Sequence, residues 1–225
     1  DKYYLLMDRD PTFSIPEGST MMAFTEQMYE QPEKLKQEAE RRLRDNIAFA
    51  EGLQRQGGLL DGFALCSDYC FNVNPFFSRD MFAEFISPYL SRAIAAYHSM
   101  GYTVIKHTDG NIMPIIDMLV ECGPDALHSL DPQGGVDLAR VSREYGDRVA
   151  LIGNVNCGLL QTGTEEACAA DVRRALREGM RRGSGYVFST SNCAYTGLAL
   201  ERYELMNRIW FEEGIYAGEE KADEQ

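Results

Sequence analysis

The chain alternates six times between a short apolar segment typical of a β-strand and an amphipathic segment typical of an α-helix. The strand-like segments are residues 2–7, 59–69, 102–107, 125–130, 148–155 and 185–190. The helix-like segments are residues 31–57, 78–101, 112–123, 136–146, 164–183 and 198–214. Strand–helix units that repeat with short connections predict an α/β fold in which helices cover a parallel sheet.

Two architectures satisfy this pattern, an open doubly wound sheet and a (β/α)8 barrel. A barrel usually needs about 250 residues and eight units, whereas this chain has 225 residues and six units. The units therefore form either an open sheet or most of a barrel that lacks its first part. No G-x-G-x-x-G or Walker-type loop follows a strand, which disfavours the nucleotide-binding form of the open sheet. We expect one domain over residues 1–215 and an acidic tail over residues 216–225.

The charge balance argues against two classes of principal partner, nucleic acid and anionic membranes. The chain has 22 basic and 35 acidic residues and a net charge of −13, and both nucleic acid and anionic membranes require a basic surface. No apolar run approaches the length of a membrane span. The six cysteines are spread thinly and no signal peptide precedes them, so we expect reduced thiols in a cytoplasmic protein.

Polar side chains gather where the predicted strands end. In α/β folds of both kinds, ligands bind at the carboxyl ends of the strands. The polar residues at these ends are Asp68, His107, Asp109, Asp131, Asn154, Asn156, Ser191, Asn192 and Cys193. Their recurrence predicts a functional site at this edge of the sheet.

The segment "VIKHTDG" contains the most informative pair of these residues. Side chains alternate along a strand, so His107 and Asp109 point to one face and Lys106 and Thr108 to the other. His107 and Asp109 could therefore share a ligand, a metal ion or a proton. The alternative is that Asp109 caps the helix predicted to begin near Ile112.

The other two histidines carry weaker signals. His98 lies near the end of an amphipathic helix-like segment, where a surface or packing role is expected. His128 and Asp131 are three residues apart, so the alternation of a strand points them to opposite faces. His128 either lines the interior of the fold or packs beneath the helices.

Four stretches resemble the uroporphyrinogen decarboxylase superfamily, which includes the decarboxylases and related cobalamin-dependent methyltransferases. They are "SRDMFAEFISPYLSRAIAAYHSMGYTVIKHTDGN", "LVECGPDALHSLDP", "LIGNVNCGLLQTGTEEACAADV" and "GYVFSTSNCAYTGLALERYELM". The resemblance implies a TIM (β/α)8-barrel type of fold with about six βα units in this chain. The arginine-rich segment and the aspartate with which the decarboxylases bind substrate have no counterpart here. Missing units would leave strand edges open, which implies a homo-oligomer or a complementary chain.

The resemblance also implies a metal site. In the methyltransferase branch, an H-x-C-G motif and a later cysteine bind zinc. The matching motif here is His107-Thr108-Asp109-Gly110, Asn192 stands where the later cysteine is expected, and Cys193 follows it. The metal ligands implied are thus His107, Asp109 and Cys193, and a carboxylate ligand suits an oxygen donor better than a thiolate.

The remaining roles that we assign complete this site. Asp68 faces the same region in the family arrangement, as a fourth ligand or a proton relay. The catalytic residues expected are His107, Asp109, Asp68 and Asn192, and the substrate-binding residues expected are Asn111, Asn154, Asn156 and Asp131. The alternative is a metal-free pocket in which His107, Asp109 and Asn192 bind the substrate by hydrogen bonds.

Three functions remain open at this point. We favour a metal-dependent methyltransferase that acts on a small methylated substrate, with a methyl-corrinoid supplied by a partner protein. The first alternative is decarboxylation of uroporphyrinogen or a similar polycarboxylate, which needs cationic groups to bind the carboxylates. Only Lys106 and Arg79 lie near the predicted mouth. The second alternative is a non-catalytic partial barrel that binds a corrinoid protein or a sister subunit.

Overall fold

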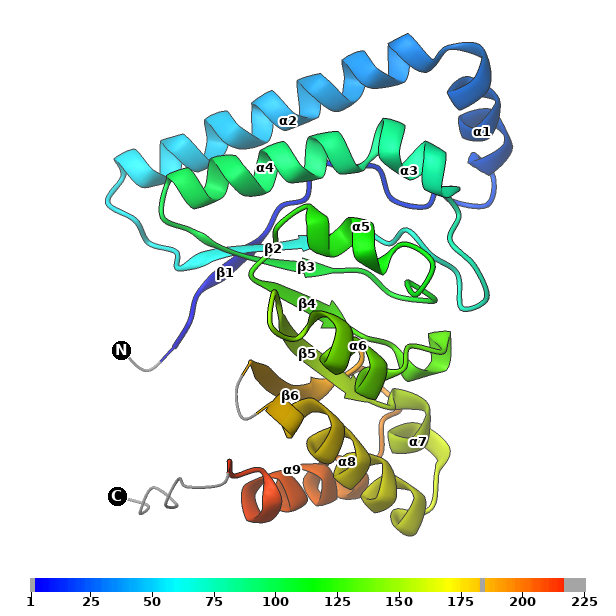
Figure 1. Cartoon of the computed structure of the whole chain (residues 1–225), viewed down its shortest axis with the longest axis vertical. Helices are drawn as coiled ribbons and strands as arrows, with labels where there is room; N and C mark the ends of the chain where they lie inside the picture. Colours follow the sequence, from blue (N-terminus) through cyan, green and yellow to red (C-terminus); the bar gives the residue numbers. More distant parts are fainter. Residues whose placement is uncertain (1–2, 183–184, 217–225) are drawn as a thin grey trace.

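The computed structural model describes residues 3–182 and 185–216. In this part of the chain six parallel strands form one sheet in the order β1-β2-β3-β4-β5-β6 (Figure 1). The strands are β1 (Leu6–Asp8), β2 (Gly62–Cys66), β3 (Thr103–His107), β4 (Ala126–Ser129), β5 (Ala150–Val155) and β6 (Tyr186–Thr190). Each strand pairs with the next one along the chain, and within the described residues β1 and β6 each keep one unpaired edge. This is the sheet of a partial (β/α)8 barrel, as predicted.

The helices follow the sheet around its outer side (Figure 1). They are α1 (Met21–Glu30), α2 (Pro32–Arg55), α3 (Arg79–Phe85), α4 (Ser87–Ser99), α5 (Ile116–Glu121), α6 (Leu138–Tyr145), α7 (Cys157–Thr162), α8 (Glu165–Gly179) and α9 (Leu200–Glu213). Within the described residues, no helix is both long and apolar enough to cross a membrane. All six cysteines lie in this part of the chain, and none of them forms a disulfide.

Burial alternates along the strands, and this alternation separates the core from the site. In β3, Val104 and Lys106 are buried beneath the helices, whereas Thr103, Ile105 and His107 are half-buried on the inner face. The outer face of the sheet therefore packs into the hydrophobic core. The inner face, which the helices leave uncovered, is available to line a cavity.

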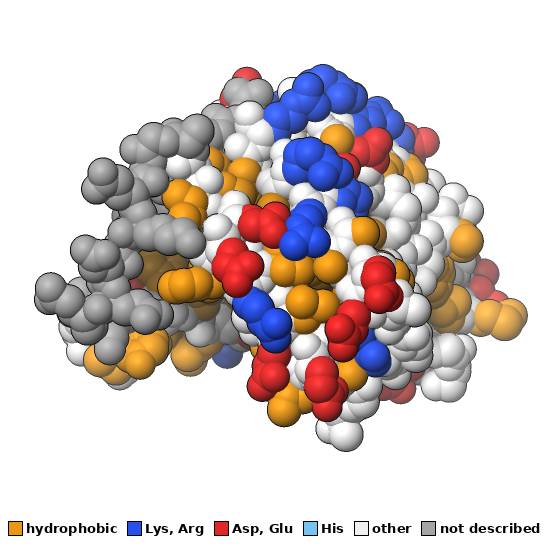
Figure 2. Space-filling model, turned by 90° about the horizontal axis from the view of Figure 1, so that it is seen from below, with side chains coloured by type: hydrophobic (Ala, Val, Ile, Leu, Met, Phe, Trp, Pro, Cys, Tyr) orange, Lys and Arg blue, Asp and Glu red, His pale blue; other side chains and the backbone are white. Residues whose placement is uncertain are grey.

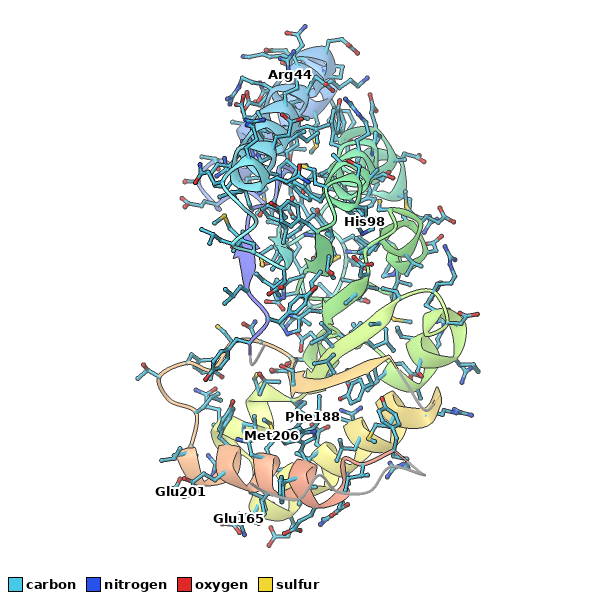
Figure 3. All side chains as sticks on the ribbon, turned by 90° about the vertical axis from the view of Figure 1, so that its left-hand side faces the viewer. Arg44, His98, Glu165, Phe188, Glu201 and Met206 are labelled. Atoms are coloured by element: carbon cyan, nitrogen blue, oxygen red, sulfur yellow. The ribbon has the colours of Figure 1, made fainter. Side chains whose placement is uncertain are left out.

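The end of the sheet at β6 has its own small core. Figure 3 shows Phe188 of β6 and Met206 of α9 between the strand and the helix, and the Phe188 ring stacks on Trp210 with 6.2 Å between the centroids. Arg173 of α8 forms an ion pair with Glu213 of α9 at 2.8 Å. Figure 2 shows acidic and basic side chains together on this end of the molecule.

The structure differs from the sequence prediction in several elements. The first strand covers Leu6–Asp8 rather than residues 2–7, of which residue 2 lies outside the described chain. The helix predicted over residues 78–101 is interrupted at Ile86, because Pro88 has no N–H to donate to the carbonyl four residues earlier. Helices α1 and α7 were not predicted, and the acidic tail lies from residue 217 onward outside the described residues.

A buried ion pair joins the first three strands. The Lys106 ammonium lies 2.7 Å from the Asp10 carboxylate and donates to the carbonyl oxygens of Leu65 and Ser67, each at 3.0 Å. Burial alone would raise the pKa of Asp10, but the Lys106 charge and the hydrogen bonds from Lys106 and Thr12 hold it below its ordinary value. Lys106 is 0% exposed, so this cation, which the sequence placed near the mouth, is buried on the face opposite His107 and paired with Asp10.

We expect Lys106→Met to destabilise the fold by about 3–5 kcal/mol, because it leaves the Asp10 carboxylate buried without its counter-ion. Urea denaturation followed by circular dichroism measures the change. Lys36→Met is the matched control, since Lys36 pairs with Glu33 and Glu84 at the surface, where such pairs contribute little. Equal losses in the two variants would contradict the structural role of the buried pair.

Candidate functional site

The structure brings Asp68, His107 and Asp109 together at the carboxyl edge of the sheet. Cys66 of β2 pairs with His107 of β3, so the residues that follow both strands leave the sheet side by side. The His107 Nε2 atom lies 3.7 Å from Asp109 Oδ1 and 3.9 Å from Asp68 Oδ1. One potential ligand atom from each residue lies within 4.8 Å of the other two, which is close enough for a single metal ion.

Hydrogen bonds hold both carboxylates in place. The Asp109 N–H donates to Asp68 Oδ1 at 2.8 Å, and the Asn192 amide donates to Asp109 Oδ2 at 2.6 Å. The second oxygen of Asp109, Oδ1, is buried and has no hydrogen-bond partner among the described residues. An unpaired buried carboxylate oxygen is costly, and a bound cation would remove that cost.

Asp109 does not cap a helix. Helix α5 begins at Ile116, and its N-cap residue is Ile115, with no side-chain capping bond. The segment from Ile112 to Ile115 instead forms a turn closed by the hydrogen bond from the Ile115 N–H to the Ile112 carbonyl. The capping interpretation of Asp109 is therefore wrong.

His128 lies against His107 on the inner face of the sheet. The two residues are paired in the register of β3 and β4, and their Nδ1 atoms are 2.8 Å apart. Burial and then the neighbouring His107 lower the pKa of His128 to about 4. Of the two positions that the sequence left open for His128, the structure shows the inner one.

A cavity of about 450 Å³ opens beside these residues, on the inner face of the sheet. It is lined by Leu6, Ala64, Cys66, Ile105, His107, His128, Ile152, Ser189, Thr190, Asn192 and Cys193. None of these residues is Lys or Arg. The apolar lining was not predicted as part of the site, although the alternation in "TVIKH" places Ile105 on the same face as His107.

Cys193 lies beside the metal-ligand group rather than in it. It is exposed, lines the cavity, and donates its backbone N–H to Asn192 Oδ1 at 2.7 Å. The group with metal-ligand spacing contains Asp68 in its place. The structure thus favours Asp68 over Cys193 as the third ligand, because the aspartate follows β2 beside His107.

Three predicted substrate-binding asparagines have structural contacts. Asn154 is 0% exposed, donates to the Leu130 carbonyl and accepts from Arg174 Nη1 at 2.6 Å. Asn156 caps α7 by accepting from two N–H groups of its first turn. Asn111 donates to the Val73 carbonyl. The structure does not bring these amides to the cavity lining.

Asp131 remains close to the site. It caps the short 3-10 turn Pro132–Gly134 and lines a second cavity, of about 250 Å³, with Ser191, Asn192 and Tyr195 among its neighbours. Burial raises the pKa of Asp131. Because Asn192 lines both cavities, the two meet at the residue that donates to Asp109.

His98 lies outside the site. It is exposed on α4, and its Nε2 atom is 2.8 Å from Asp125 Oδ2. Figure 3 labels it on the helical side of the sheet. The surface role expected from the sequence is confirmed.

Comparison with known proteins places the fold in a family. The family model described as Uroporphyrinogen decarboxylase (URO-D) matches residues 13–209. The chain belongs to the uroporphyrinogen decarboxylase family. Its structure is similar to a methyltransferase from Methanosarcina mazei, with a TM-score of 0.67 and 19% sequence identity, over 86% of this chain and 53% of that one. The chain thus spans about half the length of that protein. A search of curated protein sequences gives no match.

Thiol alkylation at pH 8 tests the surroundings of the two exposed cysteines. Cys66 is exposed as a residue, but partial burial of its thiol, followed by the Asp8 carboxylate, raises the pKa of Cys66 to about 12, so its reactive thiolate is scarce until the pH approaches that value. We expect iodoacetamide to modify Cys193 at least about tenfold faster than Cys66, with mass spectrometry of peptides as the measurement. The urea-unfolded protein, in which both thiols are accessible, is the control.

The same experiment with one equivalent of Zn²⁺ distinguishes the two ligand sets. Cys193 stays reactive if Asp68, His107 and Asp109 hold the ion. Protection of Cys193 by Zn²⁺ would instead support the ligand set inferred from the sequence.

Proposed function

We propose that this chain carries the metal-binding site of a methyltransferase that acts on a small methylated substrate, with a corrinoid protein as its partner. One observation carries the proposal: His107 and two carboxylates converge beside an apolar cavity, and one buried carboxylate oxygen, Oδ1 of Asp109, lacks a partner among the described residues. The similarity to a methyltransferase structure supports the choice of reaction.

The donor set fits a divalent ion of the zinc class. Zinc accepts imidazole and carboxylate ligands, and Asp68, His107 and Asp109 offer one nitrogen and carboxylate oxygens. A site without thiolate is harder than one with cysteine ligands and favours oxygen donors. When bound, such an ion would act as a Lewis acid on an oxygen atom of the substrate.

The residues of the chain have separate tasks in this proposal. His107, Asp109 and Asp68 would hold the ion, while the Asn192 amide orients the Asp109 carboxylate through its 2.6 Å bond. Ile105 and Ile152 would pack against the apolar part of the substrate and exclude water from the site. The cavity would hold a methyl group bonded to this oxygen, and loss of the methyl group to the partner's corrinoid would leave the electron pair of the broken C–O bond on the oxygen. His107, Asp109 and Asp68 would hold the ion that stabilises this charge until the oxygen takes a proton from solvent.

The decarboxylase alternative loses support because the site lacks cations. Lys106 is buried against Asp10. Arg79 donates to both oxygens of Asp117 and to the Pro114 carbonyl, each at 2.7 Å. The cavity lining contains neither lysine nor arginine, so a polycarboxylate would find no counter-ion there.

Metal analysis of purified variants tests the site. We expect about one equivalent of Zn²⁺ or Co²⁺ per chain, falling at least about tenfold in His107→Ala, because two weak ligands remain without the imidazole. Asp68→Asn and Asp109→Asn should also weaken binding. His98→Ala is the matched control, since it removes a histidine paired with an aspartate outside the site. Stoichiometric metal in His107→Ala would overturn the ligand assignment.

The reaction itself is tested with the metal-loaded protein. Cob(I)alamin and a panel of small methyl ethers and methanol are supplied, with methylamines as the oxygen-free comparison, and formation of methylcobalamin is followed by absorbance. Transfer that requires His107 supports the proposal. Conversion of uroporphyrinogen to coproporphyrinogen without methyl transfer would support the decarboxylase instead.

We also propose that a segment with two strand–helix units covers the open side of the sheet. Within the described residues β1 and β6 each have an unpaired edge, and two parallel strands would complete the eight of a barrel. Val187 on β6 is 53% exposed, and Tyr3 and Leu5 just before β1 are 80% and 53% exposed. A non-catalytic partial barrel would need the same cover.

Native mass spectrometry tests whether these edges need a cover. We expect the chain alone to associate beyond its monomer mass of 25.4 kDa, because uncovered apolar strand edges pair with one another. Val187→Lys should shift the population towards monomer by placing a charge on β6. A wild-type chain that stays monomeric at all concentrations would contradict the proposal.

A further inference from the structure

His128 lies closer to His107 than the carboxylates of Asp109 and Asp68 do. The two rings have centroids 4.9 Å apart and are tilted by 38°, and their Nδ1 atoms are 2.8 Å apart. Both side chains come from adjacent positions in the register of β3 and β4. The contact is therefore fixed by the strand pairing and does not depend on a loop.

The short distance requires one proton between the two rings. Two unprotonated nitrogens would repel each other at 2.8 Å, and so would two N–H groups, so one Nδ1 donates and the other accepts. The structure must then decide which ring is the donor, because the answer determines which nitrogen of His107 carries a lone pair.

The second nitrogen of His107, Nε2, supplies the answer. A neutral imidazole carries one proton, on either Nδ1 or Nε2. If Nε2 has no acceptor for a proton, the proton lies on Nδ1 and His107 donates its Nδ1–H to His128.

The surroundings of His107 Nε2 agree with this direction. The nearest carboxylate oxygens are 3.7 Å and 3.9 Å away, on Asp109 and Asp68, which is too long for an N–H···O hydrogen bond. An N–H at this position would have no acceptor on either carboxylate. A lone pair on Nε2 would instead make this nitrogen a potential metal ligand beside the oxygens of Asp68 and Asp109.

We propose that His128 is a positioning residue that holds His107 in its Nδ1–H tautomer and so presents the Nε2 lone pair towards Asp68 and Asp109. Metal-ligating histidines commonly use their other nitrogen in this way. The acceptor in this chain is a second histidine on the neighbouring strand. The consequence for metal binding rests on the proposed function, whereas the tautomer does not.

Long-range proton–nitrogen NMR of the metal-free protein at pH 8 tests the tautomer directly. His107 is assigned by the loss of its signals in His107→Ala. We expect wild-type His107 to show a protonated Nδ1 and an unprotonated Nε2. His128→Asn should keep this pattern, because the asparagine Oδ1 can accept from the Nδ1–H. His128→Leu has no acceptor and should populate the Nε2–H form.

Two results would overturn the inference. One is a wild-type spectrum in which His107 carries its proton on Nε2. The other is a His128→Leu variant that is folded by circular dichroism and keeps the Nδ1–H form. If the leucine variant fails to fold, the wild-type and asparagine spectra still decide the question.

Metal titration separates this inference from the proposed function. We expect His128→Leu to weaken Co²⁺ binding about 10–100-fold, as loss of a residue that orients a ligand does, and His128→Asn to restore most of the affinity. If the wild type shows the Nδ1–H tautomer but does not bind Co²⁺, the proposed function is wrong and the positioning role of His128 still holds. Equal affinity in wild type and His128→Leu would overturn the positioning role.

Discussion

The segment of residues 106–109 joins the hydrophobic core to the candidate site, because its side chains point alternately outward into the core and inward to the site. Lys106 points outward and binds the carboxylate of Asp10, a residue that follows β1. It also donates to two backbone carbonyls, one in β2 and one just after it. Thr108 also points outward and accepts the Tyr69 N–H. The inward residues, His107 and Asp109, are thereby held against a scaffold in which most side chains are buried and paired. The geometry of the site is a consequence of the core behind it.

The period of two along each strand made the main features predictable from the sequence. It identified the strand ends and the common face of His107 and Asp109, and the family resemblance supplied the barrel type of fold. It could not supply contacts between strands, because these depend on register. The pairing of His107 with His128 and the approach of Asp68 are of this kind. The start of α5 was misplaced because Pro114 permits both a helix start and a turn.

The composition of the site sets it apart from zinc centres with thiolate ligands. The carboxylates of Asp68 and Asp109 stand next to His107, and the thiols of Cys66 and Cys193 line the cavity without joining the group. Carboxylates favour harder ions and oxygen-containing substrates. The apolar wall formed by Leu6, Ile105 and Ile152 and the lack of basic residues in the lining suit an uncharged substrate.

The bond from Asn192 to Asp109 crosses the mouth of the sheet. It connects the residues that follow β6 to those that follow β3, although two strands separate them in the sheet. A single amide thus joins the chain that follows the last described strand to the carboxylate beside His107. A displacement of the residues after β6 would move a donor to Asp109. If a further segment packs beside β6, as proposed, it would act on the orientation of the Asp109 carboxylate through this one bond.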